Sequence, residues 1–193
     1  MTETKQQQLA KAAQPIMDRA VDIEIAKSCL NPVPGEGNPD AELMLIGEAP
    51  GKAEDEQGRP FVGASGKFLE EMLANIDLKR EDVYITNIVK FRPPNNRDPF
   101  SDEIQACLPY LLKQIKIIDP ALIIFLGRHS MNVFFPELRI SQAHGKPVRR
   151  SGRVFLPLYH PAAALYNGSM RQTLQDDFQK IPNILALIDN QSN

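Results

Sequence analysis

Four short apolar runs recur along this chain, and amphipathic segments with helical periodicity separate them. The runs read AELMLIG, DVYITNIV, ALIIFLG and RVFLPLY, with SGKFLEEMLANI and SDEIQACLPYLLKQIKII among the segments between them. Near-continuous apolar runs are typical of strands buried on both faces, and alternation with helices is typical of parallel sheets. We therefore predict an α/β fold, in which a central four-stranded parallel sheet lies in a three-layer α/β/α arrangement.

The chain has the organisation of one domain. Its 193 residues suit a single unit with its own core. We predict an N-terminal helix over about residues 5–28, then the Pro- and Gly-rich loop CLNPVPGEGNPD, then a core over about residues 40–187. No internal repeat or low-complexity segment divides the sequence, so we take residues 1–193 as a single domain.

Composition excludes several classes of protein. No apolar run reaches the ~18–20 residues that a membrane span needs. The first residues, MTETKQQQLAKAAQ, lack the basic and then apolar pattern of a secretory signal. Two cysteines, Cys29 and Cys107, supply neither a disulfide framework nor a complete zinc quartet. We expect a cytoplasmic protein.

Charge is unevenly distributed, although the net charge is only −2. Between Glu137 and Asp176 there is no acidic residue, and the stretch carries Arg139, His144, Lys146, Arg149, Arg150, Arg153, His160 and Arg171. A local basic face suits a polyanionic partner, and a solvated charged surface explains the same pattern equally well. Composition alone leaves both open.

Three polar residues and a glycine stand where the predicted strands end. Glu48 follows the first strand, Asn87 lies near the end of the second, Gly127 follows the third and His160 follows the fourth. In open α/β sheets, ligands bind beyond the carboxyl ends of the strands. The four positions together predict a site there, although Asn87 alone is equally consistent with a structural hydrogen bond.

Two further features of the site region admit more than one interpretation. The segment GEAPG lacks both the G-x-x-x-x-G-K-[ST] and the G-x-G-x-x-G patterns, which argues against phosphate binding. Phe61, in RPFVG, has the propensity of a core residue, but its loop lies near the strand ends and could present the ring as a stacking platform.

The motifs GEAPGKAEDEQGRPFVG, VYITNIVKFRPPNNRDP, IIFLG and YHPAAAL occur in the order and spacing of the family 4 uracil-DNA glycosylases. The chain resembles that family over roughly residues 26–180. The resemblance implies a uracil-DNA glycosylase-like fold and the excision of uracil from DNA by hydrolysis of the N-glycosidic bond. The implied partner is uracil-containing DNA, single- or double-stranded, and we expect a monomer.

The resemblance also implies the catalytic residues. Glu48 would stabilise the positive charge that develops on the sugar or would position the attacking water. His160 would donate a hydrogen bond to uracil O2 as the base leaves. At the position directly after Glu48, other branches of the superfamily have an Asp, whereas this chain has Ala49. The resemblance therefore assigns the catalytic carboxylate to Glu48.

The implied base-binding residues follow the same motifs. Phe61 would stack on the flipped uracil, and Asn87 would read its O4 and N3–H edge, which cytosine presents in reverse. Glu54 would lie beside the C5 edge, where it could help to exclude thymine. Gly47 and Ala49 complete the expected substrate-binding set.

DNA contacts are expected in the stretch without acidic residues. There the phosphate-binding candidates lie in HGKPVRRSGR. A wedge residue is expected after HPAA, where Ala164, Leu165 and Tyr166 follow one another. The set assigned to DNA is His144, Lys146, Arg149, Arg150 and Leu165. His144 stands where relatives usually carry an Arg.

The sequence departs from the family at one cofactor. Family 4 members typically hold a four-iron four-sulfur cluster through four cysteines, and the matching positions here are Ala26, Cys29, Phe91 and Cys107. Such clusters require thiolates, which Ala and Phe cannot replace. We therefore predict no cofactor, with Phe91 filling the vacated space.

Three functions remain open from sequence. The first is a monofunctional uracil-DNA glycosylase without a cluster. The second is a glycosylase with a shifted preference for hypoxanthine or xanthine, which the replacement of Arg by His144 leaves possible. The third is a non-catalytic DNA-binding paralogue, which the lost cysteines motivate.

Overall fold

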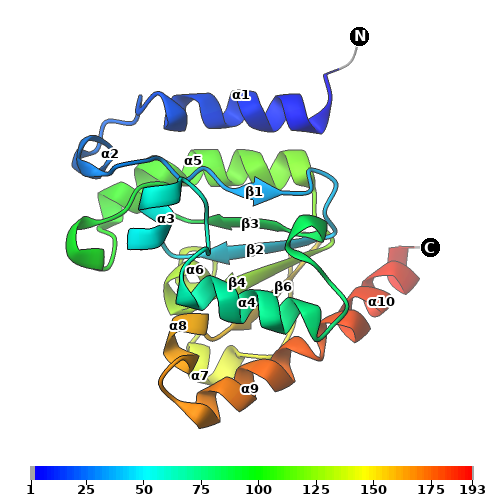
Figure 1. Cartoon of the computed structure of the whole chain (residues 1–193). Coiled ribbons are helices and arrows are strands. Elements are labelled where there is room, and N and C mark those ends of the chain that lie inside the picture. The colour runs from blue at the N-terminus through cyan, green and yellow to red at the C-terminus, as the bar shows by residue number, and fades with distance from the viewer. Residues whose placement is uncertain (1–2, 193) are drawn as a thin grey trace.

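The computed structural model describes residues 3–192, and a six-stranded mixed sheet runs through the centre of this described part (Figure 1). In spatial order its strands are β1 (Glu36–Gly37), β3 (Tyr84–Asn87), β2 (Leu43–Gly47), β4 (Leu122–Leu126), β6 (Arg153–Leu158) and β5 (Val148–Arg150). The inner four strands are parallel, and β1 and β5 pair antiparallel at the two edges. The predicted α/β class with a central parallel sheet is confirmed, and two short edge strands widen the sheet.

Helices cover both faces of the sheet. Their bounds are α1 (Lys5–Met17), α2 (Glu24–Ser28), α3 (Lys52–Gln57), α4 (Ala64–Ala74), α5 (Ser101–Ile118), α6 (Arg128–Phe134), α7 (Ile140–Ala143), α8 (Pro161–Ala164), α9 (Gly168–Phe178) and α10 (Ile181–Ser192). Two 3₁₀ turns, η1 (Arg80–Asp82) and η2 (Pro94–Asn96), precede and follow β3. In the described part of the chain, no helix combines the length and apolar character that crossing a membrane requires.

Alternating strand residues build two cores. In β2, Leu43 and Leu45 face the layer of α4, α8, α9 and α10, whereas Met44 and Ile46 face the layer of α5, α6 and α7. Successive side chains of a strand point to opposite faces, so a strand with helices on both sides must be apolar throughout. That requirement explains why the four inner strands read as unbroken apolar runs, and Figure 1 shows α1 packed outside α5.

The predicted single helix over residues 5–28 is wrong, because two helices with a break between them occupy this region. Arg19 adopts a left-handed backbone, with φ of 54°, directly after α1 ends. Its guanidinium donates hydrogen bonds to the carbonyl oxygens of Ala26, Cys29 and Leu30. These contacts stabilise the reversal of the chain, so tertiary bonding overrides the helical periodicity.

Candidate active site

The carboxyl ends of the central strands converge on one pocket. It has a volume of about 380 Å³. Its walls include six of the residues expected to bind or transform a substrate, namely Glu48, Ala49, Glu54, Phe61, Asn87 and His160. These residues come from three strand ends and the loop after β2, as expected when a ligand binds beyond the carboxyl ends of parallel strands.

Gly47, the seventh expected residue, does not line the pocket but packs against two residues that do. It is the last residue of β2 and pairs with Asn87 on β3. A Cβ atom at Gly47 would lie 2.4 Å from Oδ1 of Asn87 and 2.7 Å from the ring of Phe61. Only a glycine therefore allows the Asn87 carboxamide and the Phe61 ring to lie so close to the strand.

Phe61 has a buried ring and a strained backbone. Its φ is 51°, in the left-handed region, which costs a bulky residue roughly 1–3 kcal/mol. The ring is 5 % exposed and stacks against the imidazole of His160, with centroids 5.6 Å apart and planes at 29°. The strained loop thus delivers an aromatic face to the pocket wall.

Asn87 is held from beneath by a buried lysine. The Lys90 Nζ donates to the Asn87 backbone oxygen at 2.8 Å, to Thr86 Oγ1 at 2.6 Å and to Gln114 Oε1 at 2.8 Å. Burial lowers the pKa of Lys90 to about 7, and the neighbouring Cys107 opposes the fall. None of the side-chain hydrogen bonds found in residues 3–192 uses the Asn87 carboxamide, which leaves it available to a ligand.

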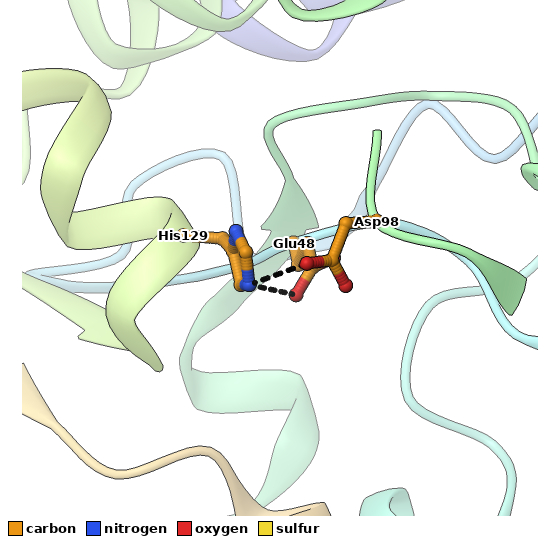
Figure 2. A group of neighbouring side chains, drawn as sticks. All are labelled: Glu48, Asp98 and His129. Atoms are coloured by element: carbon orange, nitrogen blue, oxygen red, sulfur yellow. Dashed lines mark ion pairs between the residues drawn. The ribbon is translucent and has the colours of Figure 1, made fainter. Parts of the chain in front are cut away.

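Glu48 has two neighbours that the sequence did not predict (Figure 2). Its Oε2 lies 3.8 Å from Nε2 of His129, and the same nitrogen lies 3.3 Å from Oδ2 of Asp98. Burial raises the pKa of Glu48; Asp98 raises it further, while His129 and Arg128 oppose the rise. His129 is two residues beyond Gly127, so a slightly wider search of the third strand end would have found it.

The three side chains of Figure 2 also have the composition of a metal site. Their ligand atoms lie within 4.8 Å of one another. However, Arg128 Nε lies 3.0 Å from His129 Nε2, which brings a positive charge beside the nitrogen that a metal would need. Asp98 is also largely exposed. We assign no metal to this group.

An ion pair fixes the loop that carries Asp98. The Arg97 guanidinium binds both carboxylate oxygens of Glu103 on α5, at 2.8 and 2.6 Å, and the Phe100 N–H donates to the same carboxylate. Hydrogen bonding to Arg97 lowers the pKa of Glu103, which keeps the pair charged. Pro93, Asn96 and Arg97 join Asp98 on the pocket wall, and sequence reasoning assigned none of them.

His160 is neutral and has a defined tautomer. It caps α8, where its Nδ1 accepts a hydrogen bond from the Ala162 N–H at 3.1 Å. Burial lowers the pKa of His160 to about 4, against the opposing effect of Glu54. Because Nδ1 is an acceptor, the proton of the neutral ring is on Nε2, which can donate to a ligand.

Glu54 braces the loop of the pocket. One carboxylate oxygen accepts from the N–H groups of Val62 and Gly63 at 3.0 and 2.9 Å, and the other accepts from the Gly51 N–H at 3.1 Å. The three bonds join the start of α3 to the start of α4. Glu54 therefore lines the pocket and also fixes the segment that contains Phe61.

The residues expected to contact DNA are not among those that line the pocket. His144 Nδ1 lies 2.6 Å from Asp177, and Lys146 donates to the Gln142 backbone oxygen. Arg149 and Arg150 lie on the edge strand β5, where Arg150 stacks over Phe135.

Carboxylates from elsewhere in the chain neutralise part of the stretch without acidic residues. Besides the pair formed by His144, Arg153 binds Asp119 at 2.7 Å and Arg150 lies 3.7 Å from Glu137. The partners come from outside the basic stretch or from its boundary, so the fold makes this surface less basic than the sequence predicts.

The wedge candidates differ in exposure. Leu165 is partly buried and packs against the core beneath α8, whereas Tyr166 is 96 % exposed. Of the two side chains, Tyr166 is the one that projects from the surface, two residues after α8 ends.

The four positions that match cluster cysteines lie together. Ala26, Cys29, Phe91 and Cys107 belong to one buried apolar group with neighbours such as Ile25. Burial raises the pKa of both thiols, which favours their protonated forms. Two thiols, a methyl group and a phenyl ring do not fit a cluster that needs four thiolates.

Comparison with known proteins agrees with this geometry. The chain matches the model of the uracil DNA glycosylase superfamily over residues 34–186. It is 52 % identical over 161 residues to the type-4 uracil-DNA glycosylase of Sulfurisphaera tokodaii, which covers 78 % of this chain and 73 % of that protein. The type-4 enzyme of Saccharolobus solfataricus is 50 % identical over 168 residues, covering 81 % and 77 %, and that of Archaeoglobus fulgidus is 48 % identical over 167 residues, covering 82 % and 84 %. This chain belongs to the uracil DNA glycosylase superfamily.

Proposed function

We propose that this protein excises uracil from DNA by hydrolysing the N-glycosidic bond, which leaves an abasic site. The observation that carries the proposal is the single pocket in which Glu48, Phe61, Asn87 and His160 meet. The names of the type-4 relatives support the same activity.

The pocket suits a base that has been flipped out of the DNA stack. Flipping costs a few kcal/mol, which the contacts in the pocket must offset. The Phe61 ring offers a stacking face, and the Asn87 NH₂ and carbonyl match uracil O4 and N3–H. Cytosine presents the opposite donor and acceptor, so it would leave buried polar groups unpaired.

Glu48 and His160 match the charges that develop during cleavage. The bond breaks with positive charge on the sugar and negative charge on the departing uracil. The Glu48 carboxylate stabilises the sugar or positions the water that attacks it, and the His160 Nε2–H donates to uracil O2. Preorganised groups of this kind contribute about 3–4 kcal/mol each to lowering a barrier.

We also propose that the protein works without an iron–sulfur cluster. The apolar group around Phe91 supports this, because a phenyl ring and the Ala26 methyl group stand at two ligand positions. An iron and sulfide determination on protein purified without oxygen tests it. Stoichiometric iron would contradict the proposal.

The wider proposal concerns DNA and the state of the protein. Uracil-containing DNA is the partner, with Tyr166 as the residue that enters the helix, and the basic residues His144, Lys146, Arg149 and Arg150 contact phosphates outside the pocket.

The protein acts as a monomer in the cytoplasm, and its two free, buried cysteines are usual for a reducing compartment. Gel filtration tests the monomeric state.

A panel of oligonucleotides tests the activity. Each contains one uracil, hypoxanthine, xanthine or thymine, single- or double-stranded, and alkaline cleavage reports abasic sites. We expect cleavage at uracil, and a large loss in Asn87→Ala but not in Glu56→Ala, which changes an exposed carboxylate on α3. Cleavage only at hypoxanthine or xanthine would contradict the proposed substrate, and DNA binding without any cleavage would favour a non-catalytic paralogue.

A further inference from the structure

The strained conformation of Phe61 depends on groups that lie outside the pocket. A left-handed backbone at a bulky residue persists only where the surrounding structure holds it. The carbonyl oxygen of Phe61 contacts the helix α4 and the turn η1. A Cβ atom at Gly66 on α4 would lie 1.8 Å from this oxygen, so α4 packs directly against it.

Arg80 binds the same carbonyl from the other side. Its Nη1 donates to the Phe61 oxygen at 2.8 Å, and its Nη2 donates to the oxygen of Pro60. One guanidinium thus holds two consecutive carbonyls of the loop. Its side chain is only 16 % exposed, so water does not compete freely for these bonds.

Glu36 fixes the remaining edge of the guanidinium. The Arg80 Nε lies 2.7 Å from Glu36 Oε1, on the short edge strand β1. The planar guanidinium of an arginine holds its donors in a fixed, spread arrangement that here reaches a carboxylate and two carbonyls, whereas a lysine offers its three donors from a single nitrogen. Glu36 and Arg80 therefore connect the edge of the sheet to the backbone of Phe61.

We propose that Arg80 is a positioning residue that acts through Phe61 on base stacking. The inference rests on the proposed function for the role of the ring, but the contact itself does not. Loss of Arg80 frees the carbonyls of Pro60 and Phe61, and the loop relaxes from its strained conformation. The ring then leaves the position in which it covers the base.

Arg59 provides a matched control. It binds the same Glu36 carboxylate through Nε and Nη2, at 2.8 and 2.9 Å. Its side chain is 53 % exposed, and the hydrogen bonds and ion pair found for it within residues 3–192 go to Glu36 and not to Phe61. Replacing Arg59 removes an ion pair with the same carboxylate and leaves the two carbonyls bound, although Arg80 also lies 3.4 Å from Glu70 Oε1.

The test compares Arg80→Met, Arg80→Lys and Arg59→Met in uracil excision, with free uracil as a competitive inhibitor. We expect Arg80→Met to raise the inhibition constant of uracil and KM about tenfold, a typical effect of one lost stacking contact. Arg80→Lys is expected to be intermediate and Arg59→Met to stay within about twofold of wild type. Equal effects of Arg80→Met and Arg59→Met would overturn the proposal.

A double-mutant cycle separates positioning from general stability. In a Phe61→Leu background, Arg80→Met is expected to have little further effect on the uracil inhibition constant, because the ring it positions is gone. The same loss in both backgrounds would show that Arg80 acts independently of Phe61 and would overturn the proposal.

Amide hydrogen exchange tests the contact without reference to activity. Arg80→Met should accelerate exchange at residues 61–63, and Arg59→Met should not. If wild-type protein excises no uracil, the proposed function fails, while exchange still decides the positioning role. Unchanged exchange in Arg80→Met would overturn it in either case.

Discussion

The Glu48 carboxylate lies 3.8 Å from Nε2 of His129, which itself lies 3.3 Å from the Asp98 carboxylate. Burial is the main influence on the pKa of this proposed catalytic group, and these two neighbours modify it in opposite directions. Burial and Asp98 raise the pKa of Glu48, whereas His129 and Arg128 lower it, and the net effect is a rise. Single substitutions of these neighbours are therefore expected to change the pKa of Glu48.

The first prediction concerns the acid limb of the pH profile. In the proposed mechanism excision needs ionised Glu48, so we expect kcat/KM to fall as the pH falls through its raised pKa. His129→Gln removes an effect that lowers this pKa, so the limb moves to higher pH. Asp98→Asn removes an effect that raises it, so the limb moves to lower pH. Profiles of both variants, with Asp102→Asn on α5 as the control, measure the two shifts. Shifts in the same direction would contradict this arrangement.

The buried lysine beneath Asn87 gives a prediction about stability. Lys90→Met leaves the Gln114 and Asn87 oxygens without their donor inside the core. We expect the free energy of unfolding to fall by roughly 2–4 kcal/mol, because unpaired buried acceptors keep their full desolvation cost. Urea unfolding measures it, with the exposed Lys113→Met on α5 as the control. A loss no larger than that of the control would show that Lys90 is not a structural donor.

Tyr166 gives a prediction about duplex DNA. A projecting side chain helps most when a paired base must be flipped, so Tyr166→Ala should lower excision from double-stranded DNA about tenfold. Excision from single strands should change little. Leu165→Ala serves as the comparison, since Leu165 packs on the core and its loss should instead lower stability. Equal losses on both substrates would rule out Tyr166 as the wedge.

The apolar group around Phe91 predicts a gain of cofactor. Since Ala26 and Phe91 lie with Cys29 and Cys107, the double variant Ala26→Cys, Phe91→Cys brings four thiols into one buried group. After reconstitution with iron and sulfide we expect this variant to retain iron and the wild-type protein not to. Iron bound equally by both proteins would contradict the account. Phe91→Ala alone should cost about 3–5 kcal/mol of stability, because it leaves a cavity.

Sequence reasoning predicted the features that follow from local pattern. The apolar runs had to be buried strands, and their carboxyl ends had to share one edge, so Glu48, Asn87 and His160 could be placed together. The family motifs added Phe61 and Glu54 in the same region. The structure brings all five to one pocket.

Features set by distant contacts could not be predicted in this way. The break between α1 and α2 depends on Arg19 reaching three carbonyls beyond it. Asp177 and Asp119, outside the basic stretch, pair with His144 and Arg153 inside it. Neither periodicity nor composition shows which carboxylate a folded chain will place beside which basic side chain.

The most direct test of the account is the single-turnover excision of uracil from a duplex by Glu48→Gln. This variant keeps the shape of the side chain and removes its charge, and Glu56→Gln is the matched control. We predict a fall in rate of about a hundredfold or more, since preorganised charge is a large part of such catalysis. A Glu48→Gln rate within twofold of wild type would contradict the central role of this carboxylate.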